Sequence, residues 1–364
     1  MPNLSSGTVG RESLASFWRT ARGYWRGNSR WYAWGLIALL AICVVLQLLV
    51  QYRLNLWNRD FFNALDRRDA SVIWQQAGTV FFLVAQSVVL AIAAVWGRMS
   101  FQRQWRDWLT SRLLAMWLPA DKEAGAYTGS DEPQFAEYRI TEDARVATDA
   151  PIDLAVGLLA SMLTAGTFVT VLWSVGGSVD LGPLGIDRQL PGYLVFAAVI
   201  YASLTTVLMM VIGRNMASVI EQKNEAESEF KFAVARLHAY LDRRGGVDDG
   251  APHSILLTEA SASLKEVIFQ WSRLCGQLMR TTLVGHGNSL LAPLIGLILC
   301  VPNYIHGDMP LGEMTQSAAA FVAVQGAFNW LVDNYPRLAD WASSASRVGS
   351  LISSLEGNPT VVKD

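Results

Sequence analysis

Six long apolar runs organise this chain of 364 residues. Each run approaches the roughly 20 residues that a helix needs to cross the hydrocarbon core of a bilayer. The first run is too long for a cleaved signal peptide, and no small-residue cleavage site follows it, so we expect it to remain as a span. The pattern predicts transmembrane helices near residues 31–51, 72–96, 152–174, 191–213, 283–304 and 315–332.

The polar connections between these runs alternate between short and long. The long ones keep helical periodicity over most of their length, which predicts pairs of helical arms that extend the spans and meet at a turn. Glycine and proline place the two turns near AGAYTGSDEP (124–133) and RRGGVDDGAPHS (243–254). The short connections are 52–71, 175–190 and 305–314, and the long ones are 97–151 and 214–282.

Arginine and lysine are divided unequally between the two sides of the predicted membrane. Residues 1–30 and the two long segments carry most of them. The positive-inside rule therefore predicts that both termini and both long segments are cytoplasmic. The short connections hold only Arg53, Arg59, Arg67, Arg68 and Arg188.

Residues 1–30 mix aromatic rings, such as Phe17, Trp18, Tyr24 and Trp25, with arginines. Such a segment is typical of a helix in the headgroup layer, with its rings toward the lipid and its guanidinium groups toward water. We interpret it as a cytoplasmic interfacial anchor, in preference to a ligand site. Residues 31–356 then form the six-span domain, and 357–364 form a short C-terminal tail.

Composition agrees with a membrane protein and excludes several other classes. Hydrophobic residues make up 52% and charged residues 16% of the chain, compared with about 25% charged in ordinary soluble domains. A net charge of −2 argues against nucleic-acid binding. The three cysteines, Cys43, Cys275 and Cys300, lie in or beside apolar runs without metal-ligand spacing, so we expect no disulfide and no metal site.

A phosphate-binding loop is not found in these residues. Such a loop has the pattern Gly-x-x-x-x-Gly-Lys-Ser/Thr, because backbone amides enclose the phosphates and the lysine reaches them. None of the five lysines follows a glycine. We therefore expect no nucleotide-binding domain, no cofactor and no enzymatic activity.

Two motifs carry a resemblance to a known family. The first, NLWNRDFFNALDRRD (55–69), contains Asn55, Trp57, Phe62 and Asn63, and the second, EYRITEDARVATDAP (137–151), contains Arg139, Glu142 and Asp143. Both resemble bacterial ABC half-transporters of the YddA type and their peroxisomal relatives, and the likeness extends over about residues 15–356. It implies an all-α, exporter-type ABC transmembrane domain in a bacterial inner membrane.

The acidic residues around the second motif include two further carboxylates. We expect Glu142 and Asp143, together with Asp149 and Asp153, to have a structural role. In this interpretation they brace the inner hairpin against Arg139 or Arg145.

The same landmarks are similar to the SbmA/BacA peptide transporters, which have this membrane domain and no ATPase of their own. That resemblance implies a homodimer that takes up peptides or similar bulky solutes and is driven by protons. The alternative is the permease subunit of an ABC transporter with a separately encoded ATPase as partner. A membrane scaffold without transport activity is a third possibility.

A row of carboxylates follows the fourth predicted span. Glu221, Glu225 and Glu229 are four residues apart, so on a helix they form one acidic stripe. Proton coupling, attraction of a cationic substrate and an ordinary solvated helix face are all open interpretations. His286 and Asn288, at the inner end of the fifth span, are further candidates for proton coupling or for lining the substrate cavity, because polar groups at that depth usually face an interior.

Overall fold

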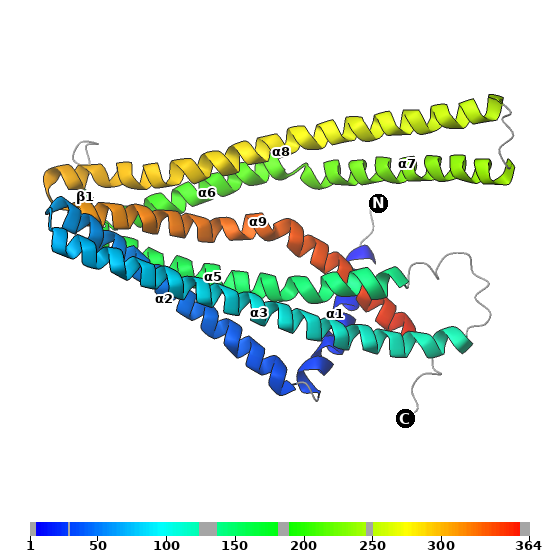
Figure 1. The fold of residues 1–364 in the computed structure, drawn as a ribbon, viewed down its shortest axis with the longest axis horizontal. Coiled ribbons are helices and arrows are strands. Elements are labelled where there is room, and N and C mark those ends of the chain that lie inside the picture. The colour runs from blue at the N-terminus through cyan, green and yellow to red at the C-terminus, as the bar shows by residue number, and fades with distance from the viewer. Residues whose placement is uncertain (1–4, 28–29, 124–136, 181–188, 245–249, 357–364) are drawn as a thin grey trace. The chain divides into compact units, whose positions relative to one another are not determined.

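The computed structural model describes residues 5–27, 30–123, 137–180, 189–244 and 250–356. These residues are almost entirely helical, which confirms the predicted all-α class (Figure 1). The chain divides into two compact units. Unit 1 comprises residues 1–196 and 296–364, and unit 2 comprises residues 197–295. The predicted turn at 124–133, residues 245–249 of the turn at 243–254 and the tail at 357–364 lie outside the described residues.

Unit 1 is a bundle of long helices. In it, α5 packs along α9, and α2 packs against both α3 and α9. A short π-helix, η1, leads directly into α5. The elements are α1 (Ser5–Arg26), α2 (Arg30–Asp66), α3 (Ala70–Glu123), η1 (Arg139–Asp143), α5 (Ala144–Val175), the start of α6 (Tyr193–Gly213), the end of α8 (Gly250–His306) and α9 (Leu311–Glu356).

One small strand pair departs from the all-helical prediction. Strands β1 (Ser178–Asp180) and β2 (Gln189–Pro191) pair in antiparallel fashion in the predicted connection between the third and fourth spans. Gly177 and Gly192 flank the pair with φ angles of 61° and 67°. Side chains other than glycine rarely adopt this backbone region, so the two glycines allow the chain to reverse here.

Among the described residues, five helices are long and apolar enough to cross a membrane. They coincide with the first five predicted spans. The sixth predicted span lies in α9, which forms a helix but is not among the five. Polar residues interrupt its apolar sequence, and three of them, Gln316, Ser317 and Gln325, are buried inside unit 1. Because these polar groups are buried in protein, they do not contact lipid. The sixth span is therefore neither confirmed nor contradicted, and it stays a prediction.

The helices α5 and α9 approach each other closely. A Cβ on Gly157 of α5 would lie 2.6 Å from Nε1 of Trp330 on α9, so only glycine fits there. Each helix also contains an internal proline, Pro151 in α5 and Pro336 in α9. Proline removes one helical hydrogen bond and favours a bend. In Figure 1, α9 changes direction along its second half.

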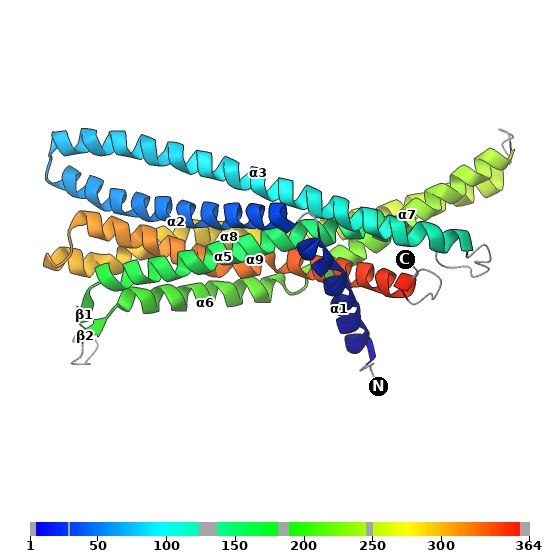
Figure 2. The ribbon, with the colours of Figure 1, turned by 90° about the horizontal axis from the view of Figure 1, so that it is seen from below.

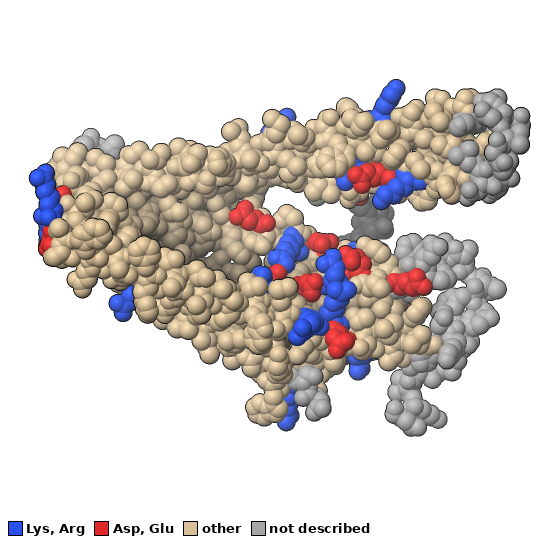
Figure 3. All heavy atoms as spheres, in the orientation of Figure 1, with Lys and Arg blue, Asp and Glu red and all other residues tan. Residues whose placement is uncertain are grey.

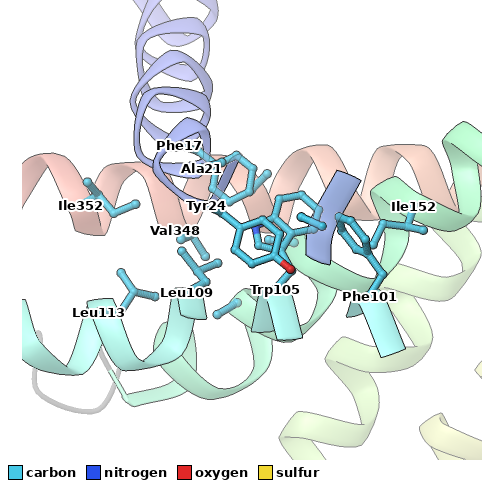
Figure 4. Packing of buried hydrophobic residues seen from close by; sticks show 14 of the residues in the cluster. Phe17, Ala21, Tyr24, Phe101, Trp105, Leu109, Leu113, Ile152, Val348 and Ile352 are labelled. Atoms are coloured by element: carbon cyan, nitrogen blue, oxygen red, sulfur yellow. The ribbon is translucent and has the colours of Figure 1, made fainter. Parts of the chain in front are cut away.

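The largest buried cluster of unit 1 joins α1 to α3 and α9. Phe17 and Tyr24 of α1 are 0% and 1% exposed and pack among Phe101, Trp105 and Val348 (Figure 4). Figure 2 shows α1 running at a steep angle to α3. The expectation that the rings of residues 1–30 face lipid is therefore wrong for these two, because the protein itself buries them.

Unit 2 consists of two helical stretches that lie side by side. The helix α7 (Met216–Arg244) follows α6 after a two-residue turn at 214–215, and α8 returns along it (Figure 1). The buried residues Val219, Ala226 and Ala233 of α7 are seven apart, which is the spacing of a coiled-coil seam. The predicted helical arms are thus present as continuous helix; their position in the cytoplasm remains a prediction.

Candidate functional site

The acidic stripe lies on one flank of α7. Glu221, Glu225 and Glu229 are exposed. Within the described part of the chain, none of the three forms an ion pair or hydrogen bond through its carboxylate. Glu221 and Glu225 lie more than a quarter turn from the buried seam of Val219 and Ala226, and Glu229 lies beside that seam. The structure therefore leaves this row of like charges open to solvent.

The opposite flank of α7 is occupied by a compact polar contact with α8. Nζ of Lys223 lies 2.6 Å from Oε1 of Glu227 and 4.9 Å from the ring centre of Trp271. The indole Nε1 of Trp271 donates to the same carboxylate oxygen at 3.2 Å. Glu227 is consequently held between two partners, which distinguishes it from the three glutamates of the acidic stripe.

The two polar candidates of the fifth predicted span have different surroundings. Oδ1 of Asn288 accepts a hydrogen bond from the hydroxyl of Tyr201 at 2.8 Å, which links α8 to α6 inside unit 2. His286 is exposed. In the described segments no three histidine, cysteine, aspartate or glutamate side chains gather to hold a metal ion. Asn288 therefore serves a helix contact, whereas His286 is accessible.

The first family motif connects the end of α2 to two other helices. Nδ2 of Asn55 donates to the backbone carbonyl of Gln316 at 3.0 Å, and Nε1 of Trp57 donates to that of Gln76 at 2.8 Å. Oδ1 of Asn63 accepts from the backbone amide of Gly312 at 2.9 Å, which satisfies a free amide in the first turn of α9.

Phe62 and Gly312 complete this junction. Phe62 is half-buried and meets Phe61 edge to face, with ring centres 5.6 Å apart. A Cβ on Gly312 would lie 2.1 Å from the carbonyl oxygen of Arg59, so the start of α9 touches the backbone of α2. In this structure the motif residues hold helices together.

The second family motif includes the π-helix η1, and one of its carboxylates is deeply buried. Asp143 is 1% exposed. Its two oxygens accept from Nη2 and Nε of Arg347 at 2.6 and 2.8 Å. Glu142 instead pairs with Arg145 in the next turn. The expected partner Arg145 is therefore found for Glu142 and, at 3.9 Å, for Asp149, but these pairs are three and four residues apart and do not join separate helices. Asp143 pairs instead with α9, and Arg139 forms no ion pair among the described residues.

Two helices also converge on Asp153 of α5. Nε of Arg98 on α3 lies 3.3 Å from Oδ1 of Asp153, and Arg337 on α9 donates to Oδ2. The expectation that Arg139 or Arg145 would pair with Asp153 is wrong. On the face of unit 1 seen in Figure 3, most charged side chains gather in one area, and a smaller group lies at the left end. Nothing in the local sequence of α9 marks Arg337 or Arg347 as a partner of α5 or η1.

The comparisons with known proteins agree with this architecture. Residues 24–241, more than half of the chain, match the family model described as ABC transporter transmembrane region 2. The chain belongs to this family. It is a component of the membrane domain of an ABC transporter of YddA type, and therefore a multi-pass protein of the inner membrane.

The curated relatives are longer proteins. The inner membrane ABC transporter ATP-binding protein YddA of Escherichia coli is 24% identical over 89% of this chain and 58% of its own length. An ABC transporter ATP-binding protein of Synechocystis is 23% identical over 91% of this chain and 48% of its own. The chloroplastic ABC transporter D family member 2 of Arabidopsis thaliana is 17% identical over 94% and 46%. The chain thus spans about half the length of the curated relatives it matches.

Proposed function

We propose that this membrane domain takes up peptides or similarly bulky solutes as a proton-coupled homodimer that does not require ATP. The observation that carries the proposal is the contrast within α7 between Glu227, which is held by Lys223 and Trp271, and the acidic stripe, whose carboxylates have no partner in the described residues. Proton coupling needs carboxyl groups that bind and release protons during the transport cycle.

The acidic stripe suits that role because its three carboxylates are exposed and no cation pairs with them in the described residues. Glu221, Glu225 and Glu229 are near neighbours on one helix flank, and Glu221 is nearest to α6. We therefore assign the leading role to Glu221, with Glu225 and Glu229 in support. Attraction of a cationic substrate uses the same charges and is compatible with this assignment.

A second copy of the chain fits the exposed side of α8. Leu264, Ile268, Trp271 and Leu278 are each between 41% and 57% exposed, and their spacing of four, three and seven places them along one face. The sequence predicts this segment outside the bilayer, where a row of apolar side chains is usually covered by a partner. The row supports the homodimer in the proposal.

The direction of transport follows from the membrane potential. A cationic solute gains about 2.3 kcal/mol per charge on moving inward through 100 mV, so uptake does not depend on ATP, whereas export of the same solute works against the field. The 364 residues contain no Gly-x-x-x-x-Gly-Lys-Ser/Thr sequence. This also favours an energy source other than ATP hydrolysis by these residues.

A second candidate function is the permease part of an ATP-driven transporter. It is favoured by the printed names of the relatives, which describe ATP-binding proteins, and by the match to only about half of their length. In this case an ATPase partner supplies the energy, and the acidic stripe attracts substrate or remains a solvated helix face.

Transport in a purified system separates the candidates. The protein is placed in liposomes with an imposed pH gradient and a labelled cationic peptide. Uptake without nucleotide supports the proposal, and uptake only after an ATPase and ATP are added supports the second candidate. Absence of uptake under both conditions overturns both and leaves a membrane scaffold.

A further inference from the structure

A cavity of about 700 Å³ lies in unit 1 where α1, the start of α2 and α3 meet. Its volume is within the range of small-molecule sites. One face of α3 forms a large part of the lining, because residues 104, 107, 108, 111 and 112 follow helical spacing. Tyr24 of α1 and Tyr32 of α2 complete the wall.

The cavity presents opposite charges on an aromatic surface. Arg112 and Asp107 both line it, and neither forms an ion pair with any described residue. The guanidinium of Arg112 lies over the ring of Trp108, 5.8 Å from its centre. A guanidinium group binds phosphate well, while a carboxylate attracts an ammonium group. The lining therefore fits a ligand that carries a phosphate and an amine.

Tyr24 gives an independent indication of a missing partner. Its side chain is 1% exposed, and its hydroxyl has no hydrogen-bond partner among the described residues. Figure 4 shows the ring reaching from α1 to the side of Trp105 on α3. Buried hydroxyl groups in proteins are nearly always hydrogen-bonded. Tyr24 lines the cavity, so a polar ligand bound there can supply an acceptor for this hydroxyl after a rotation of the tyrosine side chain.

The surroundings of the cavity indicate where such a ligand comes from. Trp31 and Trp34, on α2 next to Tyr32, are 78% and 58% exposed, and the guanidinium of Arg30 lies 5.6 Å from the ring centre of Trp31. Exposed tryptophans beside an arginine at the start of an apolar helix are typical of the membrane–water interface. The side of the cavity that Tyr32 forms therefore lies at the level of lipid headgroups.

We propose that this cavity binds the headgroup of a zwitterionic phospholipid such as phosphatidylethanolamine. Arg112 and Tyr24 hold the phosphate region, and Asp107 holds the ammonium group. Bound lipid then fills the junction between α1, α2 and α3. The inference does not depend on the proposed transport activity, because it concerns unit 1 and uses none of the residues of the acidic stripe.

Native mass spectrometry of the delipidated full chain tests the proposal. Equal amounts of phosphatidylethanolamine and phosphatidylglycerol are added back to the wild type and to the variants Arg112→Gln and Asp107→Asn. We expect the wild type to retain phosphatidylethanolamine preferentially, Arg112→Gln to lower its retention by about tenfold, which is the loss of roughly one charge-assisted hydrogen bond, and Asp107→Asn to lose the preference over phosphatidylglycerol.

The matched control is Arg103→Gln. Arg103 is exposed on α3 and lies nine residues before Arg112, which is half a turn away on the opposite face of the helix. We expect its retention of lipid to equal that of the wild type. Equal retention in Arg112→Gln and the wild type, or an equal loss in Arg103→Gln, overturns the proposal. Displacement of the lipid by free phosphoethanolamine at equal concentration overturns the assignment to a lipid and indicates a soluble ligand.

Discussion

The carboxylate of Asp143 forms a two-pronged ion pair with the guanidinium of Arg347, 204 residues later in the chain. Asp143 is buried and Arg347 also donates to Ser344, so the contact joins η1 to the last part of α9. A buried carboxylate is stable in its charged form only when such partners remain. The pair is therefore a point at which α9 is held to the rest of unit 1.

Removal of this arginine tests the role of the pair in stability. We expect Arg347→Met to lower the free energy of unfolding by about 2 kcal/mol, somewhat less than for a fully buried pair because the Arg347 side chain is partly exposed. Thermal unfolding in detergent measures the change. The control Arg145→Met breaks the exposed pair with Glu142 and should have little effect. Addition of Asp143→Asn to Arg347→Met should recover part of the loss; equal shifts for Arg347→Met and Arg145→Met contradict the interpretation.

The close approach at Gly312 leads to a second prediction. A Cβ at this position meets the backbone of Arg59, which cannot move without displacing α2. We expect Gly312→Ala to reduce strongly the amount of folded protein recovered in detergent. Gly326→Ala is the control on the same helix, since no atom lies within 4 Å of a Cβ there. Similar recovery of the two variants, measured by size-exclusion chromatography, is the outcome that contradicts the prediction.

The acidic stripe leads to a third prediction. We expect Glu221→Gln and Glu225→Gln to reduce proton-driven uptake to the level of empty liposomes, without lowering the amount of protein in the membrane, because glutamine cannot exchange a proton. Glu227→Gln, on the same helix, should retain uptake. If both stripe variants transport like the wild type, the proton-coupling role is excluded and the solvated-face interpretation stands.

The orientation in the membrane can be tested by two single cysteines in a background without the native ones. Asn224 of α7 and Asp308, between α8 and α9, are both exposed. Because arginine and lysine favour the cytoplasmic side, we expect a membrane-impermeant maleimide to label Asp308→Cys in spheroplasts and Asn224→Cys in inverted vesicles. The reverse pattern would falsify the predicted orientation.

The sequence predicted the features that depend on local pattern. Apolar runs and helical periodicity were sufficient for the helical class and for five of the helices that can span a membrane. The spacing of Glu221, Glu225 and Glu229 also predicted a shared flank, which the helix α7 confirms.

Contacts between distant segments were not predictable in this way. The partner of Asp143 is Arg347, and that of Asn288 is Tyr201, 87 residues away. Arginine and tyrosine are common on helices, and no local pattern distinguishes the one that will lie opposite a given carboxylate or amide. The burial of Phe17 and Tyr24 by protein was not predictable either, because an amphipathic helix has the same sequence pattern whether lipid or protein covers its apolar face.

The prolines of α5 and α9 give these two helices a shared mechanical property. Pro151 and Pro336 each weaken their helix at one point, and Asp153 and Arg337, which lie within two residues of them, are bonded to each other. The ion pair thus joins the two helices close to the positions where each lacks a helical hydrogen bond. We therefore expect a bend at one of these prolines to be transmitted through the ion pair, so that α5 and α9 bend together.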